Sequence, residues 1–282
     1  MNVLDGRAMA ADMAGSLAAR TATLRESGIV PRLAVVASGA EPAVESYVRM
    51  LERGAKRVGV NCATVWLPAT TDARALGRVL DELSADPVVH GVLLQTPLPA
   101  GIAPAAVAAH LSPDKDVDGL NPLSAGRLQV GQPGFVPATA AAIMEILRRA
   151  GAPLTGAEAV VVGRSLVVGR PVAHLLLQAD ATVTICHSRT RSLAEVCRRA
   201  DVLVVAAGRA GLIGPDAVRP GAIVVDAGTN ATGGGLAGDV DFEAVAPVAG
   251  AITPVPGGVG PVTTMALLRQ TVDAAARGVA VG

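Results

Sequence analysis

The chain has 282 residues, a formal net charge of zero at pH 7 and 51% hydrophobic residues, which suffices for one large domain or two medium ones. The balanced charge excludes the basic surface of a typical nucleic-acid-binding protein and gives no electrostatic attraction to an anionic membrane. No apolar run reaches the about 18 residues of a membrane-spanning helix, and residues 1–7 lack the apolar core of a signal peptide, so we expect a cytoplasmic protein.

Short β-rich runs alternate with helical stretches along the first half, which is typical of an α/β fold with a parallel sheet. We expect strands at residues 32–38, 62–67 and 88–95, and helices at about 5–26, 41–58 and 73–85. A loop-rich stretch at 97–137 and a helix at about 137–150 follow, and GAPLTG at 151–156 looks like a connection between domains.

A second α/β series fills the rest of the chain. Its expected strands are residues 159–163, 182–187, 202–206, 222–226 and a last one just before Thr253, with helices at about 169–178 and 191–199. The final helix, at about 262–279, is expected to pack back on the first domain. The sequence therefore predicts two α/β domains, residues 1–145 with 262–282, and residues 146–261.

A glycine turn between a strand and a helix is the strongest local motif. Gly163 ends an apolar strand and Gly169 opens a helix, so backbone N–H groups and the helix dipole could face a phosphate. The pattern is G-x-S-x-x-x-G rather than the G-x-G-x-x-G of most dinucleotide-binding turns, and alone it also fits a plain tight turn.

The tip of the next strand bears on the choice of dinucleotide. An NAD-preferring protein usually places a carboxylate here, whereas this tip reads His187-Ser188-Arg189-Thr190. A hydroxyl and a guanidinium suit the 2′-phosphate of NADP, and Arg164 is a second candidate cation. The alternative is that both arginines are solvated loop charges. The nearby Cys186 and the other cysteines, Cys62 and Cys197, lack the spacing of a metal site, so we expect reduced thiols and no metal.

Three further segments differ from ordinary structural sequence. LLQTPLP at 93–99 places the polar Gln95 at the end of a buried strand, PDKDVDGLNP at 113–122 packs three acids and a lysine into a turn, and ITPVPGGVGPVTTMALL at 252–268 sets proline and glycine before a helix. Each segment alone is compatible with turn chemistry.

Together, and in this order, these segments resemble the methylenetetrahydrofolate dehydrogenase/cyclohydrolase family. The resemblance spans nearly the whole chain. The matching stretches are residues 46–48 (SYV), 91–99 (GVLLQTPLP), 113–119 (PDKDVDG), 163–165 (GRS), 187–190 (HSRT), 221–226 (GAIVVD), 238–240 (GDV) and 252–261 (ITPVPGGVGP).

The resemblance implies an N-terminal α/β catalytic domain, completed by the C-terminal helix, and a Rossmann-type domain that binds NADP. It assigns a tetrahydrofolate one-carbon derivative to residues 1–145 and the cofactor to residues 146–261, and it implies a homodimer. Tyr47 would stack on the aromatic part of the folate, Asp118 would hydrogen-bond the pterin ring, and Gln95 would lie beside the reacting carbon. The segment with Gly257, Gly258, Val259, Gly260 and Thr263 would line the folate and the nicotinamide. The expected cofactor-binding residues are Gly163, Arg164, Ser165, Ser188, Arg189 and Thr229.

The sequence departs from the family at one catalytic position. The family has a lysine four residues after its tyrosine, whereas Leu51 stands four residues after Tyr47. These two positions share a helix face, because four steps turn the helix by about 400°. Lys56 lies nine steps on and points away, and Arg49 and Arg53 stay protonated, which makes arginine a poor base.

The two reactions of the family depend differently on that lysine. Hydride transfer needs placement and the electron pair of the neighbouring folate nitrogen. Hydrolysis of the methenyl product needs water activation, to which a positioned amine contributes about 10²–10⁴-fold. We therefore expect dehydrogenase activity with weak or absent cyclohydrolase activity. Two alternatives stay open: a fully bifunctional enzyme that forms 10-formyltetrahydrofolate, and a non-catalytic folate- or NADP-binding paralogue.

Two smaller departures follow. Residues 137–142 read PATAAA where the family has Pro-Cys-Thr-Pro-x-Gly, and the loss of glycine at Ala142 predicts a loop with a changed course. Thr229 replaces an aliphatic residue that the family places near the nicotinamide.

Overall fold

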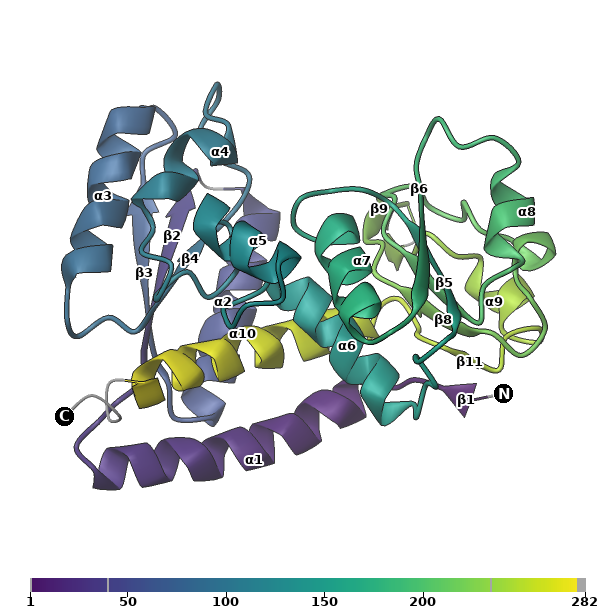
Figure 1. Ribbon diagram of the computed structural model, residues 1–282. Helices are drawn as coiled ribbons and strands as arrows, with labels where there is room; N and C mark the ends of the chain where they lie inside the picture. Colours follow the sequence, from purple (N-terminus) through teal and green to yellow (C-terminus); the bar gives the residue numbers. More distant parts are fainter. Residues whose placement is uncertain (1, 40, 234, 278–282) are drawn as a thin grey trace. The chain divides into compact units, whose positions relative to one another are not determined.

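The computed structural model describes residues 2–39, 41–233 and 235–277, which form two compact units (Figure 1). The six-stranded unit comprises Met1–Ala10 and Thr139–Thr263, and the three-stranded unit comprises Ala11–Ala138 and Thr264–Gly282. Both units are α/β, as the sequence predicts. No helix in the described part of the chain is long and apolar enough to cross a membrane.

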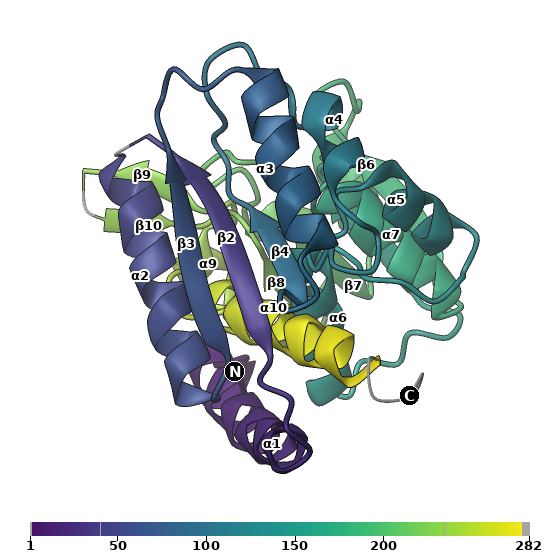
Figure 2. The same cartoon turned by 90° about the vertical axis from the view of Figure 1, so that its left-hand side faces the viewer.

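The three-stranded unit is built around a parallel sheet in the order β3-β2-β4, whose strands lie side by side in Figure 2. Its strands are β2 (Arg32–Ser38), β3 (Asn61–Leu67) and β4 (Gly91–Leu94), and its main helices are α2 (Pro42–Arg57) and α3 (Ala73–Ala85). The chain moves outward from β2 to β3 and then back past β2 to β4. Right-handed crossovers in opposite directions place α2 and α3 on opposite faces of the sheet, so the central strand is buried from residue 33 to 37.

The expected loop-rich stretch at 97–137 is wrong in part, because it contains three short helical segments. They are α4 (Pro104–Val107), η1 (Ala108–His110) and α5 (Pro122–Gln129). Asn121 caps α5, since its side-chain oxygen accepts a hydrogen bond of 2.7 Å from the Leu123 N–H, and proline at the first helical position supports the start. These helices have one or two turns, too few to show a helical period in the sequence.

Helix α10 (Val259–Arg277) contributes residues 264–277 to the three-stranded unit. The Gln270 side chain fastens it: Nε2 donates to the carbonyls of Val117 at 2.8 Å and Val136 at 2.9 Å, and Oε1 accepts from the Val136 N–H at 3.0 Å. The buried amide thus joins the C-terminal helix to the segments on either side of Asp118. Residues 264–277 of the C-terminal helix thus lie in the same unit as residues 11–138.

The six-stranded unit holds a parallel sheet in the order β1-β11-β8-β7-β5-β6. Its strands are β1 (Asn2–Val3), β5 (Glu158–Val162), β6 (Thr182–Cys186), β7 (Val202–Val205), β8 (Ile223–Asp226) and β11 (Ala251–Ile252), and its helices include α7 (Gly169–Gln178), α8 (Leu193–Cys197), α9 (Phe242–Val245) and the 3-10 turn η2 (Pro215–Ala217). A hairpin of β9 (Asn230–Thr232) and β10 (Gly235–Ala237) follows β8. The chain runs from β5 outward to β6 and returns to β7 on the other side of β5. This reversal is the switch point of a doubly wound fold, where such sheets bind ligands at the carboxyl ends of their strands.

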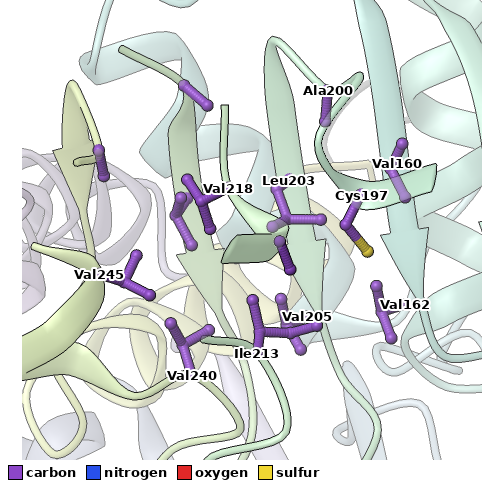
Figure 3. Close-up of a cluster of buried hydrophobic side chains, with 14 of the residues drawn as sticks. Val160, Val162, Cys197, Ala200, Leu203, Val205, Ile213, Val218, Val240 and Val245 are labelled. Atoms are coloured by element: carbon purple, nitrogen blue, oxygen red, sulfur yellow. The ribbon is translucent and has the colours of Figure 1, made fainter. Parts of the chain in front are cut away.

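One hydrophobic cluster fills a face of this sheet (Figure 3). Val160 and Val162 of β5 meet Leu203 and Val205 of β7, and Cys197 of α8 packs beside them. Strands covered on both faces need apolar side chains at successive positions, which explains the continuous valine runs of β5 and β7.

The N-terminal residues take a place that the sequence did not predict. Asn2 and Val3 pair with Ala251 and Ile252, and the Leu4 N–H donates to the Ile252 carbonyl at 2.8 Å. Helix α1 (Gly6–Glu26) then begins where Asp5 Oδ1 accepts from the N–H groups of the next turn. The first ten residues therefore belong to the six-stranded unit.

Gly6 and Gly15 offer a test of this N-terminal packing. A Cβ at Gly6 would stand 1.7 Å from the Gly258 carbonyl oxygen, whereas nothing lies within 4 Å of a Cβ at Gly15 of the same helix. We expect Gly6→Ala to lower the free energy of unfolding by ~1–3 kcal/mol, and Gly15→Ala to raise it by ~0.5–1 kcal/mol. Urea denaturation followed by circular dichroism measures both, and equal stability of the two variants would contradict the packing.

Candidate functional site

The carboxyl edge of the three-stranded sheet gathers the first group of predicted site residues. The Gln95 N–H donates to the Val36 carbonyl at 2.9 Å, so Gln95 continues the β4 ladder by one residue. Its Nε2 donates to the Thr96 carbonyl at 2.6 Å, and the side chain is half-buried. Gln95 thus stands at the end of a rigid strand, as the sequence predicts.

Two aspartates of the DVD turn have different surroundings. Asp116 is buried, and its carboxylate accepts from the N–H groups of Leu120 at 2.9 Å and Asn121 at 2.7 Å, which fixes the turn. Asp118 Oδ1 accepts from the Ala138 N–H at 2.8 Å, at the first residue of α6 (Ala138–Arg149). Asp118 therefore lies at the positive end of a helix, and it keeps a second oxygen for a ligand.

The pKa values of Asp118 and Tyr47 are both raised, and the charge of Asp118 contributes to the shift at Tyr47. Burial raises the pKa of Asp118 to about 7; the Ala138 N–H opposes this shift and the charge of Asp116 adds to it. Burial, with the negative charge of Asp118 as the next cause, raises the pKa of Tyr47 above its ordinary value. The structure therefore brings together a neutral phenol and a carboxyl group that titrates near neutrality.

Leu51 belongs to the buried stripe of α2. Its side chain is 0% exposed, and Val44, Val48, Ala55 and Val58 continue the same apolar face. The helix therefore carries an aliphatic packing residue one turn after Tyr47. The expectation that Lys56 points away is consistent with its position, since Lys56 lines a separate cavity with Arg25, Arg32 and Glu52.

The segment around Ala142 corrects one sequence expectation. Ala142 lies inside α6 and is fully buried, so it does not belong to a loop. Alanine suits the interior of a helix better than glycine does, so the substitution favours the helix and does not imply a changed loop.

In the six-stranded unit, the glycine turn follows β5. A Cβ at Gly163, where φ is +132°, would lie 2.2 Å from the Ala206 carbonyl oxygen, and one at Gly169 would lie 2.2 Å from the Gly163 carbonyl oxygen. Ser165 Oγ accepts from the N–H groups of Val168 at 3.1 Å and Gly169 at 3.3 Å. The glycines thus let α7 start directly against the strand ends, which is the cradle that a dinucleotide phosphate requires.

The tip of β6 is a tight turn that presents two side chains. The His187 N–H donates to Thr190 Oγ1 at 2.8 Å, and the Arg189 N–H donates to His187 Nδ1 at 3.1 Å. Ser188 and Arg189 are exposed on the turn, Arg164 is exposed after β5, and residues 187–192 contain no carboxylate. This donor set fits a phosphate on the ribose better than two free hydroxyls.

Cys186 and Cys197, the last residues of β6 and α8, hydrogen-bond each other inside the core. This bond, with help from the Thr190 hydroxyl, lowers the pKa of Cys186 to about 7. The same bond and burial raise the pKa of Cys197. Both cysteines are free thiols that link the β6 tip to α8.

A pair of buried aspartates beyond β7 and β8 was given no role by the sequence. Asp239 accepts from the N–H groups of Ala207, Gly208 and Arg209 and from Asn230 Nδ2, and Asp226 accepts from the N–H groups of Gly228, Asp239 and Val240. Burial raises the pKa of Asp226 to about 6; the three N–H groups oppose the shift. The GDV stretch could have marked Asp239, but three of its partners are backbone N–H groups 30 to 32 residues away, which no sequence pattern shows.

The segment at 257–263 divides between a loop and a helix. Gly257, with φ of +111°, and Gly258 precede α10, whereas Val259, Gly260 and Thr263 lie in its first turns. The helix therefore begins three residues earlier than expected. Thr229 is exposed beside Gly228. Tyr47, Gln95 and Asp118 are thus assembled in the three-stranded unit, and the expected cofactor residues in the six-stranded unit.

Comparison with known proteins finds two family models that together cover nearly the whole chain. Residues 4–118 match the tetrahydrofolate dehydrogenase/cyclohydrolase catalytic domain, and residues 137–279 match the NAD(P)-binding domain of the same family. A bifunctional protein FolD from Parafrankia is 58% identical over 275 residues, which cover 98% of this chain and 99% of that protein. One from Chloroflexus aurantiacus is 50% identical, covering 96% of each.

Solved structures agree. The FolD dehydrogenase/cyclohydrolase of Campylobacter jejuni superposes with a TM-score of 0.97 at 39% identity, covering 99% of each chain. The Trypanosoma brucei FolD, described as complexed with NADP cofactor and inhibitor, gives a TM-score of 0.93 at 38% identity, covering 98% of each. The chain belongs to the tetrahydrofolate dehydrogenase/cyclohydrolase family, with an N-terminal catalytic domain and a C-terminal NAD(P)-binding domain.

Proposed function

We propose that this chain oxidises 5,10-methylenetetrahydrofolate to 5,10-methenyltetrahydrofolate with NADP as the hydride acceptor. The observation that carries the proposal is the proximity of Tyr47 to Asp118, in the unit whose β4 ladder extends to Gln95. Family membership supports it, as do the names of the relatives. We also propose that residues 1–145 with 262–282 serve the folate and residues 146–261 the cofactor.

The residues suit this reaction by placement. The Asp118 carboxylate can accept two N–H donors from the aminopyrimidinone edge of a pterin, and the Tyr47 ring offers an apolar face for stacking. Gln95, held by the β4 ladder, would lie beside the carbon that loses hydride. The electron pair of the adjoining folate nitrogen stabilises the resulting cation, so fixing the folate in place is what these side chains contribute.

NADP is the proposed dinucleotide because Ser188, Arg189 and Arg164 present a hydroxyl and two cations where an NAD enzyme usually places a carboxylate. Gly163, Ser165 and Gly169 supply the phosphate turn, and Thr229 would lie near the nicotinamide. The Trypanosoma brucei relative that is described with NADP supports the same choice.

Hydrolysis of the methenyl product is the second candidate activity. The relatives are named bifunctional, which favours the fully bifunctional alternative over the weak or absent cyclohydrolase expected from Leu51. Leu51 nevertheless supplies no amine, so in this chain the hydrolysis proceeds through other groups or is slow. The homodimer stays a prediction, because the structure describes one chain.

Position 51 allows the two activities to be tested separately. We expect NADPH formation from NADP and methylenetetrahydrofolate in the unchanged protein. Leu51→Lys should speed the decay of methenyltetrahydrofolate by up to ~10²–10⁴-fold, because a positioned amine activates water. Leu51→Met, similar in volume and without an amine, is the control, and thermal melting of both variants accounts for the burial of the site.

The outcomes separate the alternatives. No NADPH formation would leave only a binding paralogue. Decay by the unchanged protein as fast as by Leu51→Lys would show that the lysine is dispensable and that the chain is bifunctional. Decay at the spontaneous rate would show that the cyclohydrolase is lost.

Arg189 decides the preference for NADP in this proposal. We expect Arg189→Ala to raise the KM for NADP by ~10-fold or more, because a charge-assisted bond to phosphate is lost, and to leave the KM for NAD unchanged. Arg199→Ala removes the same charge from the amino end of β5, where Arg199 pairs with Glu158, and is the matched control. Equal effects of the two variants would contradict a phosphate contact.

The pKa of Asp118 near 7 predicts a pH-dependent affinity for folates. The ionised carboxylate accepts the pterin N–H groups, and below pH 7 the group is protonated, so tetrahydrofolate should bind more tightly as the pH rises from about 6 to 8. Calorimetric titration across this range measures the effect. Asp118→Asn should bind more weakly and without this dependence; a flat profile in the unchanged protein would oppose the assignment.

A further inference from the structure

Asp239 is a buried carboxylate of the six-stranded unit that accepts four hydrogen bonds. Its side chain is 0% exposed. Oδ2 accepts from the N–H groups of Ala207 and Gly208, the latter at 2.8 Å, while Oδ1 accepts from the Arg209 N–H at 2.7 Å and from Asn230 Nδ2 at 2.9 Å. One carboxylate thus holds three consecutive N–H groups of one loop and the side chain of another.

The loop that Asp239 holds lies at the switch point. Residues 207–209 come directly after β7, and the Ala206 carbonyl lies close enough to Gly163 to exclude a Cβ there. In a doubly wound sheet, the dinucleotide crosses the sheet at this point. The turns after β5 and β6 serve its adenosine half, so the nicotinamide half extends over the ends of β7 and β8.

The backbone and the side chain of Asp239 are in turn fixed by residues of β8 and of the loop that follows it. Asp226, the last residue of β8, accepts from the N–H groups of Asp239 at 3.1 Å and Gly228 at 2.8 Å through Oδ1. A Cβ at Gly228 would lie 2.2 Å from Asp239 Cγ, so the loop after β8 packs directly on this carboxylate. The Asp239 side chain therefore sets the spacing between the loops that follow β7 and β8.

We propose that Asp239 is a positioning residue for the nicotinamide half of the dinucleotide: it holds residues 207–209 and 228–230 at the spacing that this half requires. The inference rests on the proposed NADP function. In this proposal Asp239 acts through the N–H groups of residues 207–209 and the Asn230 side chain and does not touch the ligand, which distinguishes it from Ser188 and Arg189.

The chemistry of the partners requires a carboxylate. The four donors at Asp239 are N–H groups, and an ionised carboxylate accepts at both oxygens and donates at neither. An asparagine would turn an NH₂ group toward one pair of these donors. Asp239→Asn therefore keeps the volume and breaks part of the clamp.

The test compares two ligands by calorimetry. NADP spans both halves of the site, whereas 2′,5′-ADP reaches only the turns after β5 and β6. We expect Asp239→Asn to raise the Kd for NADP by ~10-fold or more through the loss of buried hydrogen bonds, and to leave the Kd for 2′,5′-ADP within about twofold. The KM for NADP should rise in parallel.

Val240→Ala is the matched control for stability. Val240 is the next residue, is buried in the same core, and keeps its backbone bond to Asp226 as alanine. We expect it to lower the melting temperature without separating the two ligands. Equal weakening of NADP and 2′,5′-ADP by Asp239→Asn, or no weakening, would overturn the inference.

If Asp239→Asn fails to fold, Asn230→Ala is the second variant. It removes one of the four hydrogen bonds that Asp239 accepts. It should weaken NADP by ~3-fold with 2′,5′-ADP unchanged, and an unchanged Kd for NADP would overturn the inference. Absence of NADP binding in the unchanged protein would instead refute the proposed function.

Discussion

Buried carboxylates that accept backbone N–H groups hold the functional loops of both units. Burial of a charged carboxylate is costly unless protein N–H donors replace the hydrogen bonds that water made to it. The loops at the carboxyl edge of a parallel sheet supply such donors, because their N–H groups are not paired with a neighbouring strand. Asp116 supplies the acceptor for the turn at 120–121, and Asp226 and Asp239 do so for the loops after β7 and β8. The geometry of these loops follows from the hydrogen bonds that the three carboxylates accept.

The same arrangement explains why the glycines stand where they do. Gly228 and Gly238 each lie against an aspartate side chain, and a Cβ at Gly238 would meet Asp226 Oδ2. The backbone at these two glycines lies so close to the aspartate side chains that there is no volume for a Cβ. Gly228 and Gly238, which have no functional side chain, therefore tolerate substitution as little as the proposed site residues Gln95 and Asp118 do. Asp118 is bonded differently from Asp226 and Asp239: the Ala138 N–H donates to its Oδ1, and burial raises its pKa to about 7.

The sequence predicts the regular elements well where local chemistry and tertiary packing agree. β2, α3 and α7 have the expected bounds. An apolar run marks β2 and Gly169 marks the start of α7, and in the structure the Asp72 side chain caps α3 by accepting from the Ala75 N–H. Sequence prediction fails for β1 and the β9–β10 hairpin, whose two or three residues carry no period, and for Ala142, which the family motif suggested was in a loop. The resemblance to the family motifs is what identifies Tyr47, Gln95 and Asp118 as candidate site residues. The sequence does not predict the hydrogen bonds at Asp239, because three of its donors are main-chain N–H groups distant in the sequence.

Pairing between β1 and β11 has a consequence for synthesis. Asn2 and Val3 are synthesised some 250 positions before their partners Ala251 and Ile252. Until that late segment emerges, the edge of the nascent sheet is incomplete and the opening residues have no strand to join. The edge of this sheet can therefore close only after Ala251 and Ile252 have been synthesised.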